Sequence, residues 1–317
     1  MHLPINKLEQ RARQAKKTLS NCSLCARECK IDRTRGLVGF CGATDQLKIA
    51  HIGLHHGEEP PISGTKGSGA IFFTHCNLHC SYCQNWQISH PASQYKTNLY
   101  TEQKLADEMV SLQKNGAHNI NLISPSHYIP QIIASLCQAK KQGLTLPIVY
   151  NTNGFDSLNT LKLLEGIIDI YLPDIKYGNG AMALKYSQAP HYTETSKRAI
   201  TEMFRQVGTL ECDPNGIAQH GLIVRHLVLP NDIAGSIQDL EFLASVSPEI
   251  HLSLMSQYTP QYRAKNYPEL NRTLTAKEYA AVVETAGRLG LANGWIQEFS
   301  SQNELVPDFN SPHPFQP

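Results

Sequence analysis

Three cysteines in the first third of the chain have the residue type and spacing to bind a metal cluster. Cys76, Cys80 and Cys83 are arranged as C-x3-C-x2-C, shortly after an apolar run at residues 70–73 that predicts a strand. Three thiolates this close together can hold three irons of a [4Fe–4S] cluster, whereas ferredoxins supply four cysteines. The fourth iron is then open to a ligand from outside the chain. A structural zinc site usually has four protein ligands, so the spacing fits zinc poorly.

The residue before the third cysteine is aromatic, and Tyr82 suits a flat ligand lying beside the cluster. The C-x3-C-x-aromatic-C motif resembles the signature of the radical SAM enzymes. The wider string of residues 72–90 resembles the branch related to pyruvate formate-lyase activating enzyme. The resemblance implies that S-adenosylmethionine (SAM) binds the fourth iron through its amino and carboxylate groups. It also implies that one electron, from a donor such as flavodoxin or ferredoxin, cleaves SAM to a 5′-deoxyadenosyl radical that abstracts hydrogen from a substrate.

A second group of cysteines lies near the N-terminus. Cys22, Cys25, Cys29 and Cys41 follow a basic stretch at residues 6–20 that is expected to be a helix. In a reducing compartment, four thiols grouped in this way indicate a metal site and not disulfides. A structural zinc ion and a second iron–sulfur cluster both suit four cysteines, and the sequence does not choose between them. Free thiols without a metal are the remaining interpretation.

Composition limits the classes of partner. The chain has 317 residues, with 28 Lys and Arg against 27 Asp and Glu. A net charge this close to zero counts against a nucleic-acid or membrane-surface binder. No apolar run approaches the roughly 18 residues that suggest a membrane span. The first residues also lack the apolar core of a secretory signal, so we expect a cytoplasmic protein.

The alternation of short apolar runs with helical patterns predicts an α/β fold with a parallel sheet. An open doubly wound sheet and a barrel both suit this pattern, and the resemblance selects a partial (β/α)6 TIM-like barrel with a small cysteine-rich N-terminal segment. Residues 1–66 are expected to form the basic helix, the four-cysteine segment and a connector, residues 67–300 the barrel, and residues 301–317 a tail. The predicted strands of the barrel are residues 70–73, 119–123, 147–150, 167–172, 222–229 and 251–254.

Polar residues follow the predicted strands, at the edge where parallel sheets carry their sites. Ser124 and Ser126 come after the second strand, where activating enzymes usually carry a Gly-Gly-Glu element for the amino group of SAM. This chain lacks that element, so the two serines are expected to replace it. Asn153 after the third strand suits a ribose or carboxylate, or a plain turn. Asp174 and Lys176 after the fourth point the same way on extended chain, and the resemblance implies that they contact SAM.

The fifth and sixth strands supply further candidates. Arg225 shares the face of the apolar Ile223, so it needs a buried anion, and the SAM carboxylate is the expected partner. His226 points to the opposite face and is expected to pack against helices. Gln257 follows the sixth strand at an edge suited to ribose, adenine or substrate. The long connection of residues 177–220 is predicted to be either a substrate lid or an ordinary two-helix crossover.

These observations favour a radical SAM enzyme whose substrate is open. The resemblance to activating enzymes suggests a glycine of a partner protein, as in the activation of glycyl-radical enzymes. A second hypothesis is modification of RNA or a peptide, with the basic N-terminal segment as a docking module. The non-enzyme alternative is an iron–sulfur electron carrier or sensor. The polar residues at successive strand ends count against a carrier, because a carrier needs no pocket for SAM.

Overall fold

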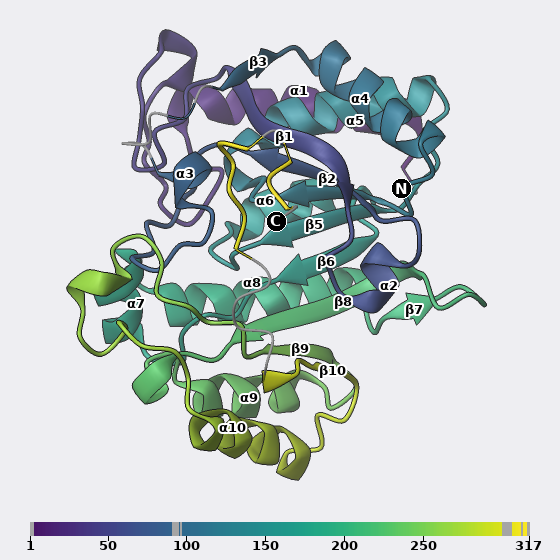
Figure 1. Cartoon of the computed structure of the whole chain (residues 1–317). Coiled ribbons are helices and arrows are strands. Elements are labelled where there is room, and N and C mark those ends of the chain that lie inside the picture. The colour runs from purple at the N-terminus through teal and green to yellow at the C-terminus, as the bar shows by residue number, and fades with distance from the viewer. Residues whose placement is uncertain (1–2, 91–94, 96, 300–305, 312, 316–317) are drawn as a thin grey trace.

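A computed structural model describes residues 3–90, 95, 97–299, 306–311 and 313–315 (Figure 1). Its strands form one sheet in the order β10-β9-β8-β6-β5-β4-β2-β1-β3, with β7 paired to β8 off this path. The strands are β1 (Leu47–His55), β2 (Ser68–Phe73), β3 (Asn98–Tyr100), β4 (Ile120–Ile123), β5 (Ile148–Thr152), β6 (Ile170–Pro173), β7 (Glu211–Cys212), β8 (Ala218–Leu227), β9 (His251–Met255) and β10 (Gly294–Ile296).

Except for the N-terminal helix, the helices lie between successive strands along the chain. None of the described helices is both long and apolar enough to cross a lipid bilayer. The helices are α1 (Ile5–Lys17), α2 (Pro60–Ser63), α3 (Trp86–Ser89), α4 (Glu102–Lys114), α5 (Ile129–Lys141), α6 (Leu158–Leu164), α7 (Gly180–Ser187), α8 (Tyr192–Val207), α9 (Ser236–Val246) and α10 (Ala276–Arg288).

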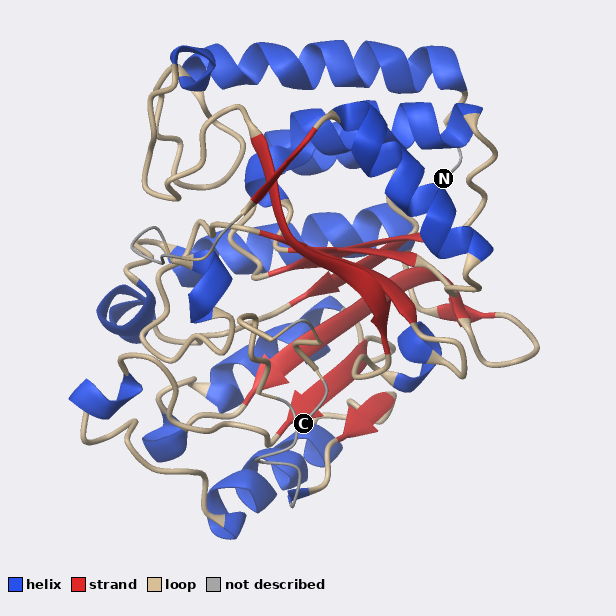
Figure 2. Cartoon of the chain, turned by 45° about the horizontal axis from the view of Figure 1, so that its top comes forward, coloured by secondary structure: helices blue, strands red, loops and turns tan. Residues whose placement is uncertain are grey.

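Six strands with helical crossovers form the barrel. All neighbouring pairs from β2 through β4, β5, β6 and β8 to β9 are parallel, and β10 extends β9 in the same direction. The sheet is strongly twisted and does not close on itself (Figure 2). This is the partial (β/α)6 barrel that the sequence and its resemblance predict. All six predicted strands are present, and the largest difference is β8, which begins at Ala218.

Alternate residues of each strand face the helices or the barrel interior. Tyr150 and Val224 belong to the large apolar core that the helices share with the sheet, whereas Val149 and Ile223 pack in a smaller cluster on the other face. His226 lies on the helix side, as predicted. Its ring is buried, and its two nitrogens lie 2.9 Å from the carbonyl oxygen of Ile175 and 2.8 Å from the hydroxyl of Ser236.

The connector that the sequence predicts before the barrel differs in the structure, because residues 51–55 belong to a strand. β1 continues to His55 and pairs antiparallel with β2, with Ile52 opposite Ile71. Most side chains of β1 are only half-buried, so its hydrophobic alternation is weak and the sequence gives little sign of a strand. The antiparallel strand carries the chain along β2 and delivers the following loop, residues 56–59, to the barrel interior.

The long connection at residues 177–220 contains α7 and α8. α8 packs against α6 and β8, which is the arrangement of an ordinary crossover and not of a lid. Of the predicted tail, residues 301–305, 312 and 316–317 lie outside the described residues. Phe309 is buried, and its ring centroid lies 5.4 Å from that of Phe72 on β2. The described part of the tail therefore packs on the interior face of the sheet.

We expect Gly154→Ala to reduce the free energy of unfolding more than Gly143→Ala. Both glycines have a positive φ, 77° and 93°, which costs a side-chain-bearing residue about 1–2 kcal/mol. A Cβ at Gly154 would also collide with the backbone oxygen of Asp174, whereas nothing lies within 4 Å of one at Gly143. Urea unfolding of the two variants measures the difference. Equal losses would show that the contact between the ends of β5 and β6 is not tight.

Candidate active site

The three cysteines lie on the loop between β2 and α3. All three side chains line one cavity of about 1270 Å³ inside the barrel. The same cavity is lined by residues at the carboxyl ends of β4, β5, β6, β8 and β9. The topology therefore brings the loop and five successive strand ends to one place, as the general rule for parallel sheets predicts.

Each of the three sulfur atoms has a polar neighbour within hydrogen-bonding distance. Hydrogen bonds to sulfur favour the thiolate over the thiol and help to set the reduction potential of an iron–sulfur cluster. The neighbours come from three different elements, so the loop is held against the barrel through its sulfur atoms. They are the amide Nδ2 of Asn153 for Cys76 (3.3 Å), the hydroxyl of Ser187 for Cys80 (2.9 Å) and the hydroxyl of Ser89 for Cys83 (3.3 Å).

Burial opposes deprotonation of these thiols. It raises the pKa of Cys76 to about 12 and that of Cys83 to about 11, and it also raises the pKa of Cys80. The thiols can become thiolates at neutral pH only if cations arrive with the deprotonation, as in metal binding. Lys176 lies close enough to lower the pKa of Cys80 and Cys83. The site fits a [4Fe–4S] cluster with three protein ligands, because three half-buried thiols open into a cavity that leaves room beside them.

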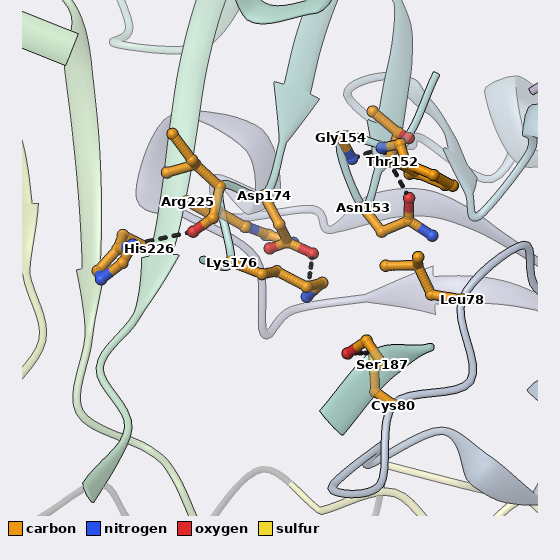
Figure 3. Close-up of polar contacts among 12 residues, drawn as sticks. Leu78, Cys80, Thr152, Asn153, Gly154, Asp174, Lys176, Ser187, Arg225 and His226 are labelled. Atoms are coloured by element: carbon orange, nitrogen blue, oxygen red, sulfur yellow. Dashed lines mark hydrogen bonds and ion pairs between the residues drawn. The ribbon is translucent and has the colours of Figure 1, made fainter. Parts of the chain in front are cut away.

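Asp174 and Lys176 form an ion pair on the cavity wall. The Lys176 Nζ lies 2.7 Å from an Asp174 carboxylate oxygen, and both side chains are about one-fifth exposed. Figure 3 shows the pair between Arg225 and the Cys80–Ser187 contact. Burial lowers the pKa of Lys176, but Asp174 and Cys80 outweigh it and raise the pKa. The two charges pair with each other, and both side chains still face the cavity, as the sequence predicts.

The anion expected beside Arg225 is supplied by the chain itself. Its guanidinium donates to both carboxylate oxygens of Glu59, at 2.7 and 2.6 Å, and to Glu58. Glu58 also accepts a hydrogen bond from Asn121 at 2.8 Å. The prediction that the SAM carboxylate is the partner of Arg225 is therefore corrected. Local sequence patterns give no sign of these partners, because the glycines and prolines around both glutamates predict a connector and not the end of a strand.

The two serines expected to replace the missing element separate in the structure. Ser124 lines the cavity and has a left-handed backbone with φ 55°, which is strained for a residue other than glycine. Ser126 is buried away from the cavity. Its hydroxyl donates to the carboxylate of Asp156 at 2.6 Å, and Tyr150 donates to the same oxygen at 2.8 Å. The structure therefore gives Ser126 a packing role and leaves Ser124 as the candidate.

The remaining candidates lie on the cavity wall. Asn153 donates to the side-chain oxygen of Asn77 at 2.7 Å as well as to Cys76, so it connects β5 to the cysteine loop. Gln257 accepts from Gln297 at 2.8 Å. The buried ring of Tyr82 packs edge-on against Tyr258, with centroids 5.9 Å apart. Sequence reasoning found these three from their positions at strand ends and beside the cysteines.

Two functional contacts were not found in the sequence. Glu58 and Glu59 precede a proline pair, and their only sequence signal is the unpaired charge of Arg225 on an apolar strand. Ser187 lies at the end of α7, far from the cysteines in sequence, and no pattern marks it. Both contacts depend on how distant segments are brought together by the fold.

The chain is similar to known proteins over most of its length. Residues 70–210 match the family model of the Radical SAM superfamily. An uncharacterized protein of Methanocaldococcus jannaschii, MJ0674, is 28% identical over 293 residues, which are 90% of this chain and 80% of the relative. The matched family segment contains the three cysteines, Asn153, Asp174 and Lys176.

Solved structures of several enzymes are also similar, each with a TM-score below 0.5. Methylornithine synthase (PylB) matches 70% of this chain and 60% of its own, with 16% identity and a TM-score of 0.46. The hydrogenase maturase HydG matches 69% of this chain and 48% of its own, with 12% identity and a TM-score of 0.47. A radical SAM methyltransferase from Sphaerobacter thermophilus matches 93% of this chain and 94% of its own, with 11% identity and a TM-score of 0.44. The chain thus spans less than two thirds of the first two.

We expect Arg225→Met to lower the free energy of unfolding by about 3–5 kcal/mol at pH 7, because it leaves buried carboxylates without their partner. Burial alone raises the pKa of Glu59, and Arg225 outweighs it so that the pKa lies below the ordinary 4.5. In the wild type, the stabilisation from the Glu59–Arg225 interaction is present above pH 4.5 and is lost as the pH falls through the lowered pKa of Glu59. In the variant, Arg225 no longer opposes burial, so the pKa of Glu59 rises.

The deficit of the variant relative to the wild type should therefore grow as the pH rises above about 4.5. Urea unfolding between pH 5 and 8 measures it. The triple variant Arg225→Met, Glu58→Gln, Glu59→Gln is the matched control and should recover most of the loss at pH 7. A deficit that does not change with pH would contradict the assignment of the charges.

Proposed function

We propose, from the radical SAM domain formed by residues 70–210, that this chain cleaves SAM and uses the resulting radical to take hydrogen from a second molecule in the same cavity. The cofactors of this family are a [4Fe–4S] cluster and SAM. One observation carries the proposal. Among the described residues, three cysteine thiols and no fourth open into a cavity that the ends of five successive strands line with polar groups.

Cys76, Cys80 and Cys83 would hold three irons of a [4Fe–4S] cluster, which would supply one electron and leave its fourth iron open to SAM. Asn153 and Ser187 keep two of the sulfurs in place through the contacts described above. The chain's contribution is thus to fix the cluster at the cavity wall and to leave one side of it accessible.

The charge of the cavity wall suits SAM. Among the residues that the structure describes, the charged side chains of the wall are three carboxylates (Glu58, Glu59 and Asp174) and two cations (Lys176 and Arg225), which leave one net negative charge. SAM carries a sulfonium, an ammonium and a carboxylate, and therefore one net positive charge. Opposite charges in a low-dielectric cavity attract more strongly than in water. Asp174 pairs with Lys176, the cation that lies beside the cysteines. We therefore assign Asp174 to the positively charged part of SAM.

The neutral side chains of the wall complete the proposed SAM site. Ser124 and Asn153 offer a hydroxyl and an amide for the amino acid part or the ribose of SAM. Tyr82 and Gln257 offer an aromatic ring and an amide for the adenosine part. All four line the same cavity as the cysteines. Ser126 is not part of this site, because its hydroxyl donates to Asp156.

The size of the cavity supports a second substrate. Pockets for ligands of the size of SAM are about 300–1000 Å³, and this cavity is about 1270 Å³. We propose that the remaining space admits a loop of a partner protein and that hydrogen is taken from a glycine α-carbon. The resemblance of residues 72–90 to the activating enzymes supports this choice. A small one-electron carrier protein such as flavodoxin or ferredoxin is the proposed reductant.

We expect the anaerobically reconstituted, reduced chain to form 5′-deoxyadenosine from SAM. In Cys80→Ala, the rate should fall to that of a protein-free control, because only two cluster ligands remain. In Asp174→Asn, SAM should bind about 10- to 100-fold more weakly, because a hydrogen bond to a charged group contributes about 1.5–3 kcal/mol. Asp107→Asn, an exposed change on α4, is the control and should alter neither. A wild-type chain that assembles a cluster but leaves SAM intact would refute the proposal.

The glycine substrate can be tested by isotope transfer. We expect 5′-deoxyadenosine to gain deuterium when the enzyme, SAM and a reductant are incubated with source-cell proteins carrying α-deuterated glycine. Mass spectrometry of the 5′-deoxyadenosine measures the transfer. Proteins labelled with ring-deuterated phenylalanine are the control and should give none. Transfer only from a deuterated protein-free small-molecule extract would contradict the protein substrate and leave the cleavage of SAM intact.

A further inference from the structure

The four N-terminal cysteines surround a cavity of their own. Cys22, Cys25 and Cys41 are buried and Cys29 is half-buried, and all four line an enclosed space between the N-terminal segment and the barrel. None of them forms a disulfide. The radical SAM chemistry proposed above uses none of these thiols, so their convergence needs a separate explanation.

The backbone is shaped to bring these thiols together. Cys22 and the segment after Cys29 are joined by two hydrogen bonds, from Cys22 N–H to the oxygen of Ile31 and from Lys30 N–H to the oxygen of Cys22, each 2.9 Å. Lys30 has a positive φ of 56°. A Cβ at Gly39 would meet the sulfur of Cys29 at 2.8 Å, so only glycine leaves this thiol its place. Backbone strain and turns that require glycine are typical of segments that form a ligand-binding site.

Two arginines beside the four thiols lack carboxylate partners among the residues that the structure describes. Arg33 is 1% exposed, donates to the oxygen of His127 at 2.7 Å, and lies 3.9 Å from the sulfur of Cys22. Its Nε is buried without a hydrogen bond. Arg27 stacks on Phe40, and one of its terminal nitrogens is also buried without a partner. Buried cations require compensating negative charge, and four metal-bound thiolates supply it.

The spacing of the thiols distinguishes between metals. A tetrahedral zinc site has Zn–S bonds of about 2.3 Å, which places its sulfurs about 3.8 Å apart and leaves no room for a water molecule between them. Across the described residues, no three His, Cys, Asp or Glu side chains are arranged to hold a single metal ion, and this finding covers both groups of cysteines.

We propose that Cys22, Cys25, Cys29 and Cys41 bind a second [4Fe–4S] cluster, with one cysteine on each iron. In both sets of cysteines, the sulfurs are then arranged for a cluster and not for a single metal ion. They differ in that the second cluster has no iron left open, so SAM cannot coordinate it. This second site is inferred from the geometry of the N-terminal segment and does not depend on the reaction in the barrel.

The two sites are also neighbours. Asn77, which follows Cys76, donates to the carbonyl oxygen of Phe155 at 2.8 Å, and the backbone of Ala26 donates to the same oxygen at 3.5 Å. The Arg27 Nε donates to the oxygen of Asn77 at 2.9 Å. The cation of Arg27 thus lies between the two groups of cysteines. Loss of the N-terminal cluster is expected to loosen the loop that carries the first one.

The decisive experiment removes the first cluster and keeps the second. We expect the full-length variant Cys76→Ser, Cys80→Ser, Cys83→Ser, reconstituted anaerobically, to retain about four irons and four sulfides per chain, against about eight in the wild type. Its reduced EPR spectrum should not change when SAM is added. Cys212→Ser, which removes an exposed thiol, is the control and should keep the wild-type iron content.

Other outcomes of this experiment would overturn the proposal. About one zinc per chain with no iron would assign the four cysteines to a zinc ion, and a folded variant without metal would assign them to free thiols. Circular dichroism establishes whether the variant is folded. The complementary variant Cys29→Ser, at the least buried of the four thiols, should lose iron while Cys76, Cys80 and Cys83 keep their cluster, and a wild-type iron content in it would also contradict the proposal.

Discussion

Charge buried inside the barrel has to be balanced inside the barrel, and much of the structure follows from this constraint. Arg225 on β8 is held by Glu58 and Glu59, and Lys176 by Asp174. A buried charge that loses its partner costs several kcal/mol, so each pair fixes the segments that carry it. The glutamate pair ties the loop after β1 to β8, and thereby closes one side of the cavity.

The need to balance buried charge also applies to the three thiols that line the cavity. Burial raises the pKa of Cys76, Cys80 and Cys83, so they bind as thiolates only together with metal cations. A cluster held by these three cysteines would leave its fourth iron to a ligand from outside the chain. The cavity therefore brings together three thiols that could hold such a cluster and a wall whose charged groups suit a cationic ligand.

Much of this could be predicted from the sequence because parallel strands deliver their following residues to one edge. The cysteine spacing, the six strands, and the positions of Asn153, Asp174 and Lys176 were all available from local patterns. The partners of Arg225 were not, because β1 is half-buried and its alternation is weak. Ser126 was assigned to SAM from its position alone, and only the structure shows that Asp156 and Tyr150 occupy its hydroxyl. Pairings between distant segments leave no local signal, and these are where sequence reasoning failed.

The central claim is that SAM binds the iron that the three cysteines leave open. Pulsed EPR of the reduced cluster, with SAM labelled with ¹⁵N in its amino group or ¹⁷O in its carboxylate, tests it most directly. The account predicts a hyperfine coupling from each label, seen in the wild type and absent when unlabelled SAM is used. A reduced cluster whose spectrum shows no coupling to either label, with SAM present in excess, would contradict it.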